Sequence, residues 1–126
     1  MLFRSRLVLL TPYAPDAGFS VGAAMGRNKL IYGLADFAVV VSSDHQTGGT
    51  WAGAVEALKA IWCPVLVRDG DAVPKGNKEL VKLGALALSA ETLRETSDLP
   101  GWVAQRAAPK PVETELFDFA LRDKPR

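Results

Sequence analysis

The chain has 126 residues, of which 48% are hydrophobic, and this combination predicts one compact domain with its own core. The formal net charge is only +1, so no overall positive field indicates a nucleic-acid-binding protein, and any basic patch has to be local. The single cysteine, Cys63, excludes an internal disulfide and a C-x-x-C zinc or redox motif, which favours a reducing, cytoplasmic setting.

The N-terminal apolar run, "RLVLLT", is too short for the apolar core of a signal peptide, which has about 7 to 15 residues. No stretch of the chain approaches the roughly 20 apolar residues of a membrane-spanning helix, so we expect no membrane partner. The run instead predicts a strand from Arg6 to Thr11. The stretch "PYAPDAG" that follows predicts a loop, because its prolines prevent regular strand pairing.

Helical and strand-like patterns alternate after this loop. Apolar residues from Val21 to Ala35 fall mostly at helical spacing, and Ser20 is placed to cap that helix. The next run, "FAVVVSS", lacks polar alternation, which is typical of a strand covered on both faces in a parallel sheet. The chain then predicts, in order, a helix over 50–62, a strand over 64–68, a loop over 69–76, a helix over 77–84 that ends at Gly84, a strand over 85–89, and a short helix over 90–96 capped by Ser89.

This alternation predicts an α/β fold, namely a three-layer Rossmann-like domain with a mainly parallel sheet of at least four strands. We place this domain at residues 1–99. Prolines at positions 100, 109 and 111 then indicate a C-terminal extension over residues 100–126, which consists of a linker and a short apolar helix. The apolar cluster of that helix comprises Leu116, Phe117, Phe119 and Ala120.

The loop "SSDHQTGGT", residues 42–50, lies where ligands bind in open parallel sheets, beyond the carboxyl end of a strand. Its glycine pair, Gly48 and Gly49, brings backbone N–H groups close to the start of a helix, where a phosphate is the expected ligand. Such a pair also occurs in ordinary turns, and the loop matches neither a Walker A motif nor G-x-G-x-x-G. Taken alone, the loop is as consistent with a turn as with a phosphate site.

Arg27 and Asn28 lie in the helix before that strand, from which they would lean over the same edge of the sheet. An arginine there suits bidentate contact with phosphate, and an asparagine suits a loop or a ligand hydroxyl. The alternative is a solvent-exposed helix face, where most charged residues lie.

Three blocks of the sequence resemble the DprA/Smf family, the DNA-processing proteins of bacterial transformation and recombination. "MGRNKLIYGLADFAVVVSS" resembles its R-N-x-x-I-x-x-L-x-D segment, "TGGTWAGAVEAL" its S-G-[ST] loop and following helix, and "GNKELVKLGA" its G-[ST]-N-x-L-[IL]-x-x-G-A segment. The resemblance covers residues 8–88. It implies a Rossmann-like domain that binds single-stranded DNA through a basic pocket, forms dimers and helps to load recombinase, without catalysis.

The sequence also departs from the family pattern. The family's G-S-R motif, which supplies part of the basic pocket, has no counterpart here. The threonine expected beyond the glycine loop falls on Ala52, the asparagine of the last block falls on Lys78, and "RDG" replaces the usual P-G. Either the chain is a shortened relative with a ligand of its own, or a second subunit completes the binding surface.

A sister group, the LOG-like proteins, includes nucleotide phosphoribohydrolases with the pattern P-G-G-x-G-T-x-x-E. Here Gly53 stands where the glutamate is expected, and Asn28 stands where the group has lysine. Glycosidic cleavage needs a carboxylate near the developing positive charge, and Glu56 lies nearly one helical turn further on. This comparison favours binding without turnover.

Five more residues are candidate ligand contacts. His45, the only histidine, lies on the glycine loop and contacts either ligand or solvent. Trp51 follows the loop directly, where it either stacks on a base or packs against protein. Arg68, Lys75 and Lys78 flank the next loop and add positive charge, which Asp69 and Asp71 partly cancel. That balance favours one or two phosphates over a long DNA track.

We therefore predict a binding protein with no catalytic residue, metal or cofactor, which recognises single-stranded DNA or nucleotide phosphate. The resemblance implies that it does so as a homodimer. The predicted phosphate contacts are Arg27, Asn28, Thr47, Gly48, Gly49 and Thr50. One alternative is a LOG-like small-molecule nucleotide site, enzymatic or sensory. Another is an interaction module without a ligand that acts through its C-terminal apolar cluster.

Overall fold

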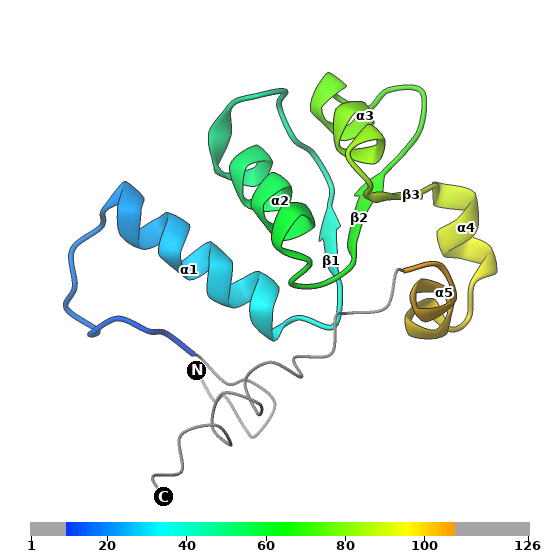
Figure 1. Cartoon of the computed structure of the whole chain (residues 1–126). Helices are drawn as coiled ribbons and strands as arrows, with labels where there is room; N and C mark the ends of the chain where they lie inside the picture. The colour runs from blue at the N-terminus through cyan, green and yellow to red at the C-terminus, as the bar shows by residue number, and fades with distance from the viewer. Residues whose placement is uncertain (1–9, 108–126) are drawn as a thin grey trace, which may run out of the picture.

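The computed structural model describes residues 10–107, which form an α/β domain around a parallel sheet (Figure 1). The sheet has the order β1–β2–β3, with β1 at Ala38–Val40, β2 at Val65–Arg68 and β3 at Leu86–Leu88. The helices are α1 (Val21–Leu34), α2 (Gly48–Ala60), α3 (Lys75–Lys82), α4 (Ala90–Glu95) and α5 (Leu99–Arg106). The alternation of helices and strands predicted from the sequence is confirmed for this part of the chain.

The three strands pair in parallel, with Val39 opposite Leu66 and Leu66 opposite Leu86. Helix α2 connects β1 to β2, and α3 connects β2 to β3, so consecutive strands are neighbours in the sheet. The carboxyl ends of all three strands therefore meet at one edge. The loop before α2 leaves the sheet at that edge.

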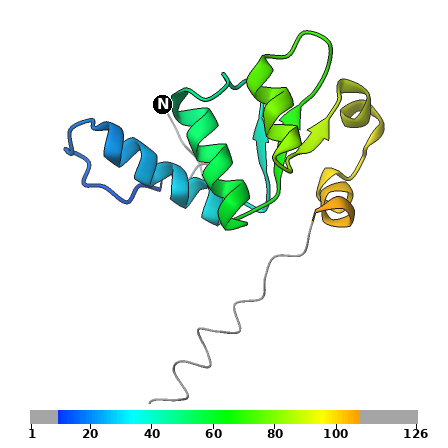
Figure 2. The same cartoon turned by 45° about the horizontal axis from the view of Figure 1, so that its top comes forward.

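Apolar side chains leave both faces of the sheet and bury two separate clusters. On one face Val40, Val65 and Val67 pack with Ala54 and Ala57 of α2, and with Leu80 of α3 and Ala85. On the other face Leu66 and Leu88 pack with Val103 of α5. Figures 1 and 2 show α2 and α3 on one side of the sheet and α5 on the other. Two helical layers thus enclose the sheet.

Helix α5 lies where the sequence predicted the start of a linker. Pro100 occupies the first turn of α5, where its missing N–H breaks no helical hydrogen bond, and the Asp98 side chain caps the helix by accepting from the Gly101 N–H at 3.0 Å. Val103 is only 3% exposed, against the sheet. The linker prediction is therefore wrong for residues 100–106: the proline begins a helix here.

The sequence predicted a sheet of at least four strands, and residues 10–107 contain three of them. The predicted strand from Arg6 to Thr11 lies outside the described residues except for Leu10 and Thr11, which belong to no strand. The helix predicted around Leu116 and Phe117 also lies outside them.

The predicted helix ends are correct where local chemistry decides them. Ser20 accepts a hydrogen bond from the Ala23 N–H at 3.0 Å, and Ser89 accepts one from the Thr92 N–H at 3.0 Å. Gly84 follows α3 with φ +111°, a left-handed conformation that glycine adopts without strain. Each of these ends is set by residues adjacent in sequence.

Helix α1, like α4, buries no residue in the described domain. It contacts α2, to which an ion pair between Lys29 and Glu56 (2.9 Å) joins it. Val21, Ile31 and Leu34 are all exposed on its surface. No helix within residues 10–107 is both long enough and apolar enough to cross a membrane.

If α5 is part of the fold, Val103→Ala will lower the free energy of unfolding by about 2 kcal/mol, because it removes two methyl groups from a closed cluster. Chemical denaturation measures this loss. Leu93→Ala is the control, since Leu93 is 54% exposed on α4 and its truncation removes little buried surface. Equal effects of the two substitutions would show that α5 does not stabilise the sheet.

Candidate functional site

The loop between β1 and α2 has the geometry of an anion site. Gln46 and Gly48 both adopt left-handed backbone conformations, with φ +60° and +81°, which turn the chain sharply into α2. Helix α2 begins at Gly48, and its first N–H groups have no carbonyl partner within the helix. Thr47, at the N-cap, makes no side-chain cap hydrogen bond among the described residues. The helix dipole and these N–H groups favour an anion here.

A small hollow of about 120 Å³ lies against this helix start. Its lining residues are Ser42, Ser43, Asp44, Thr47, Gly48, Gly49 and Thr50. Four of the six predicted phosphate contacts, from Thr47 to Thr50, thus lie together. The carboxyl group of Asp44 adds a negative charge at the same hollow, which opposes an anionic ligand. The hollow is therefore suited to a single phosphate group rather than to a run of them.

Asn77 joins the loop to the ends of two strands. Its Nδ2 donates to the carbonyl of Val41 at 3.1 Å and to the carbonyl of Arg68 at 2.9 Å, while its Oδ1 accepts from the Ser43 N–H at 2.8 Å. The side chain is 1% exposed, so water does not compete for these bonds. One amide thereby positions the backbone on which the hollow is built.

Gly76 allows this contact by bringing α3 against the loop. A Cβ at position 76 would collide with the carbonyl oxygens of Ser43 and Asp44, which belong to rigid backbone. Only glycine lets the first turn of α3 approach so closely, because every other residue carries a Cβ. Neither Gly76 nor Asn77 was among the site residues predicted from the sequence.

Asn28 borders the glycine loop from the side of α1. An added Cβ at Gly49 would lie 3.9 Å from the Asn28 Nδ2, and one at Gly53 would lie 3.2 Å from the Tyr32 ring. Gly53 therefore lets α1 approach α2 closely, whereas a Cβ at position 49 would make only an ordinary contact. Burial raises the pKa of Tyr32, and the negative charge of a Cys63 thiolate would raise it further, so the phenol stays protonated at neutral pH.

Arg27 lies on a different side of α1. It is exposed and lines a hollow formed with the preceding loop, whose other residues include Tyr13, Phe19 and Ser20. It is not among the residues that line the hollow at the glycine loop. The structure therefore brings Asn28 to the loop but does not bring Arg27 with it.

The second group of predicted contacts lies near the carboxyl ends of the strands. The Arg68 Nε donates to the carbonyl of Val41 at 3.0 Å, which holds this exposed side chain beside the first residue of the loop. Lys75 and Lys78 are exposed at the start of α3. A hydrogen bond from Lys82 lowers the pKa of Glu79, and the electrostatic interactions with Lys82, His45 and Lys75 lower it further. Basic groups thus gather at this edge of the sheet.

His45 and Trp51 contact each other. Their rings meet edge to face, with centroids 5.1 Å apart and planes at 88°. Trp51 is half-buried and also packs against the cluster on the α2 face of the sheet. The packing alternative for Trp51 therefore has direct support, while base stacking stays a prediction.

Positions 53 and 56, which were considered for a catalytic glutamate, have other roles in the structure. Gly53 is buried beneath the Tyr32 ring, where a glutamate side chain would not fit without displacing that ring. Glu56 is paired with Lys29. Within residues 10–107 no three His, Cys, Asp or Glu side chains are grouped in a way that suits a metal ion.

Sequence reasoning missed Asn77 because the resemblance aligned the family's asparagine with Lys78. The structure buries Asn77 and exposes Lys78. The sequence did contain a signal. Asn77 follows Gly76 at the start of the helix and stands three positions before Leu80, so it lies on the same helix face as that core residue.

A family model described as DNA recombination-mediator protein A matches residues 2–98 of the chain. No curated protein and no solved structure matches the chain.

Replacing Asn77 by alanine will lower the free energy of unfolding by about 3 kcal/mol, because it leaves the Ser43 N–H and two carbonyl groups without their buried partner. Thermal and chemical denaturation measure the loss. Lys78→Ala is the matched control, since it truncates the exposed neighbour on the same helix and should change stability by less than about 0.5 kcal/mol. If both variants unfold like the parent chain, Asn77 does not hold the loop.

Proposed function

The chain belongs to the DNA recombination-mediator protein A family, as its motifs predicted, and on this premise we propose that it binds phosphate groups of single-stranded DNA or of a nucleotide at the loop of residues 42–50. Family membership supports a DNA-processing or recombination-related role. The binding is not accompanied by catalysis.

The observation that carries this proposal is a hollow that lies against the start of α2 and is lined by a loop that Asn77 holds. Asn77 holds Ser43 by a 2.8 Å hydrogen bond, and Gly48 turns the chain into α2 at φ +81°. A loop that is already held in position loses little conformational entropy when the ligand binds. Backbone N–H groups at a helix start then provide donors for phosphate oxygens, whatever base the nucleotide carries.

The contacts within this proposal are Thr47, Gly48, Gly49 and Thr50 at the hollow, with Asn28 beside Gly49. Arg68 supplies positive charge from the end of β2, where its Nε is bonded to the Val41 carbonyl. His45, Lys75 and Lys78 lie further out along the same edge. Arg27 contacts a ligand only if that ligand extends around α1, because it lines a separate hollow.

Single-stranded DNA is the favoured ligand because the family is one of DNA recombination-mediator proteins. A free nucleotide is the second candidate because the hollow is small. A volume of about 120 Å³ suits one phosphate group, and Asp44 limits the positive charge nearby. Hydrolysis is not proposed for either ligand, since the carboxylate that cleavage requires is absent at Gly53 and Glu56 is paired with Lys29.

A homodimer belongs to the same proposal. The exposed apolar side chains of α1, Val21, Ile31 and Leu34, offer surface for a second copy. Two copies would bring two glycine loops to one strand of DNA and so raise the affinity without new contacts.

Thr50→Glu will weaken binding of a fluorescent single-stranded oligonucleotide by about tenfold or more, because it places a negative charge at the hollow. The substitution leaves the fold intact, since a carboxylate near a helix start stabilises the helix. Fluorescence polarisation at low salt measures the affinity. Ala52→Glu is the matched control, because Ala52 is exposed on the same helix and does not line the hollow.

If the parent chain binds no oligonucleotide at low salt, the DNA proposal fails. Thermal-shift measurements with nucleoside monophosphates then test the second candidate, which requires stabilisation of the parent chain and none of Thr50→Glu. Equal weakening by Thr50→Glu and Ala52→Glu would place the ligand elsewhere on the protein.

Asp44→Asn will tighten oligonucleotide binding several-fold, because it removes the one carboxylate among the residues that line the hollow. The same polarisation titration measures this gain. Asp71→Asn makes the same change of net charge on an exposed residue of the next loop and serves as the control. Weaker binding by Asp44→Asn would instead assign the carboxylate a direct contact with the ligand.

A further inference from the structure

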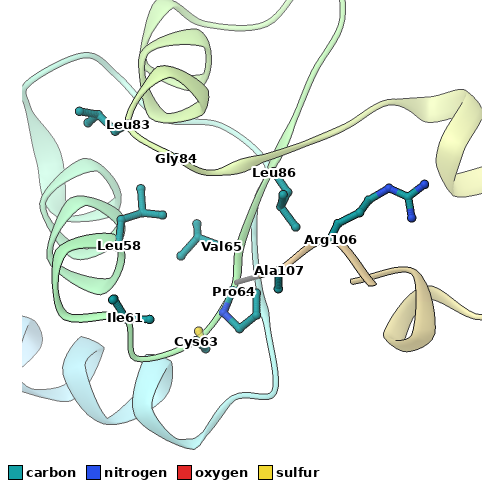
Figure 3. A pocket seen from close by; sticks show the side chains of 10 residues that line it. All are labelled: Leu58, Ile61, Cys63, Pro64, Val65, Leu83, Gly84, Leu86, Arg106 and Ala107. Carbon is teal, nitrogen blue, oxygen red and sulfur yellow. The ribbon is translucent and has the colours of Figure 1, made fainter. Parts of the chain in front are cut away.

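An apolar pocket of about 380 Å³ opens at the end of the sheet opposite the glycine loop (Figure 3). It lies where β2 and β3 begin and is closed by the ends of α2 and α5. Its lining residues are Leu58, Ile61, Cys63, Pro64, Val65, Leu83, Gly84, Leu86, Arg106 and Ala107. Only Arg106 among them carries a charge at neutral pH, so the pocket suits an apolar occupant.

We propose that this pocket receives the chain's own C-terminal segment, residues 112–121, through the side chains of Phe117 and Phe119. The segment "VETELFDFAL" places Leu116, Phe117, Phe119 and Ala120 within five positions of one another, between charged residues on both sides. Aromatic side chains provide the large apolar area that a pocket of this kind can bury.

The point where the described chain ends favours this occupant. Ala107, the last described residue, itself lines the pocket. Phe117 stands ten positions further along the chain, a length that spans at most about 33 Å when extended. The connection to the segment therefore starts at the pocket, and it is long enough for the segment to turn back into it.

Tethering also favours the segment over a separate molecule. A short connection keeps the segment at an effective concentration on the order of millimolar near the pocket. A second copy of the chain at micromolar concentration competes poorly with it.

The charge at the edge of the pocket also favours the C-terminal segment as the occupant. Figure 3 shows the Arg106 side chain extending outward from α5 at the edge of the pocket, where its guanidinium lies 4.4 Å from the centre of the Trp102 ring. Glu113 and Glu115 precede the apolar cluster of the segment, and Asp118 lies within it. The acidic side chains of the docked segment would lie near this single arginine, which favours one orientation of docking.

Docking gives two exposed side chains a partner. Ile61 and Leu83 line the pocket, yet each is about half exposed in the described part of the chain. Apolar side chains at the mouth of an apolar pocket are typical of a surface that another segment covers.

Disulfide trapping tests the proposal directly. In a chain that also carries Cys63→Ala, the pair Leu83→Cys and Ala120→Cys, which keeps both phenylalanines, should form an intramolecular disulfide under mild oxidation with oxidised glutathione at micromolar protein. The matched control replaces Leu83→Cys with Leu93→Cys, since Leu93 has the same exposure, 54% against 53%, but does not line the pocket. Mass spectrometry under non-reducing conditions measures both yields.

Selective trapping at position 83 supports the proposal. Equal yields at 83 and 93 would overturn it, because they would show that the segment visits the whole surface. Disulfides between two chains at position 83 would also overturn it, since the occupant would then be a second copy.

A second measurement uses no new cysteine. The double substitution Phe117→Ala with Phe119→Ala should lower the melting temperature of the full chain by several degrees. Phe19→Ala removes an aromatic ring that is 88% exposed and distant in sequence, and should leave the melting temperature unchanged. An unchanged melting temperature for the double variant would contradict docking.

Discussion

The hydrogen bonds of Asn77 are the constraint on which the functional edge of this domain depends. Parallel strands end with carbonyl and N–H groups that the sheet no longer pairs, and at a binding edge these groups need partners that leave room for a ligand. A single buried amide meets this need for β1, β2 and the loop after β1 together. Gly76 makes the contact sterically feasible, since any Cβ there would collide with the loop backbone.

The two ends of the sheet consequently have different chemistry. At the carboxyl ends, a polar loop that Asn77 holds lines a small hollow at the start of α2. At the amino ends, apolar residues surround a larger pocket with no anchored loop. Binding a phosphate requires donors fixed in position, whereas receiving an apolar segment requires only surface of suitable size. The same three short strands therefore carry, at one end, the hollow where we propose phosphate binding and, at the other, the pocket where we propose docking.

Features that depend on neighbouring residues could be predicted from the sequence, and features that depend on distant ones could not. The caps at Ser20 and Ser89 and the stop at Gly84 follow from local hydrogen bonds and backbone freedom, and the structure has them as predicted. Pro100 was misread, because whether a proline breaks a helix or begins one depends on the surface available for that helix to cover. Arg27 and Asn28 are adjacent in sequence, yet only Asn28 borders the glycine loop, since their side chains leave α1 in different directions.

By itself, the sequence determined the α/β alternation, the position of the glycine loop at the end of a strand, and the family, because each of these follows from local patterns and from motifs read along the chain. Only the tertiary structure decided which polar residue holds the loop. Asn77 and Lys78 are polar neighbours that differ in burial. The amide lies where three backbone groups converge, while the ammonium group remains in solvent. That convergence joins Val41, Ser43 and Arg68, which no local pattern brings together.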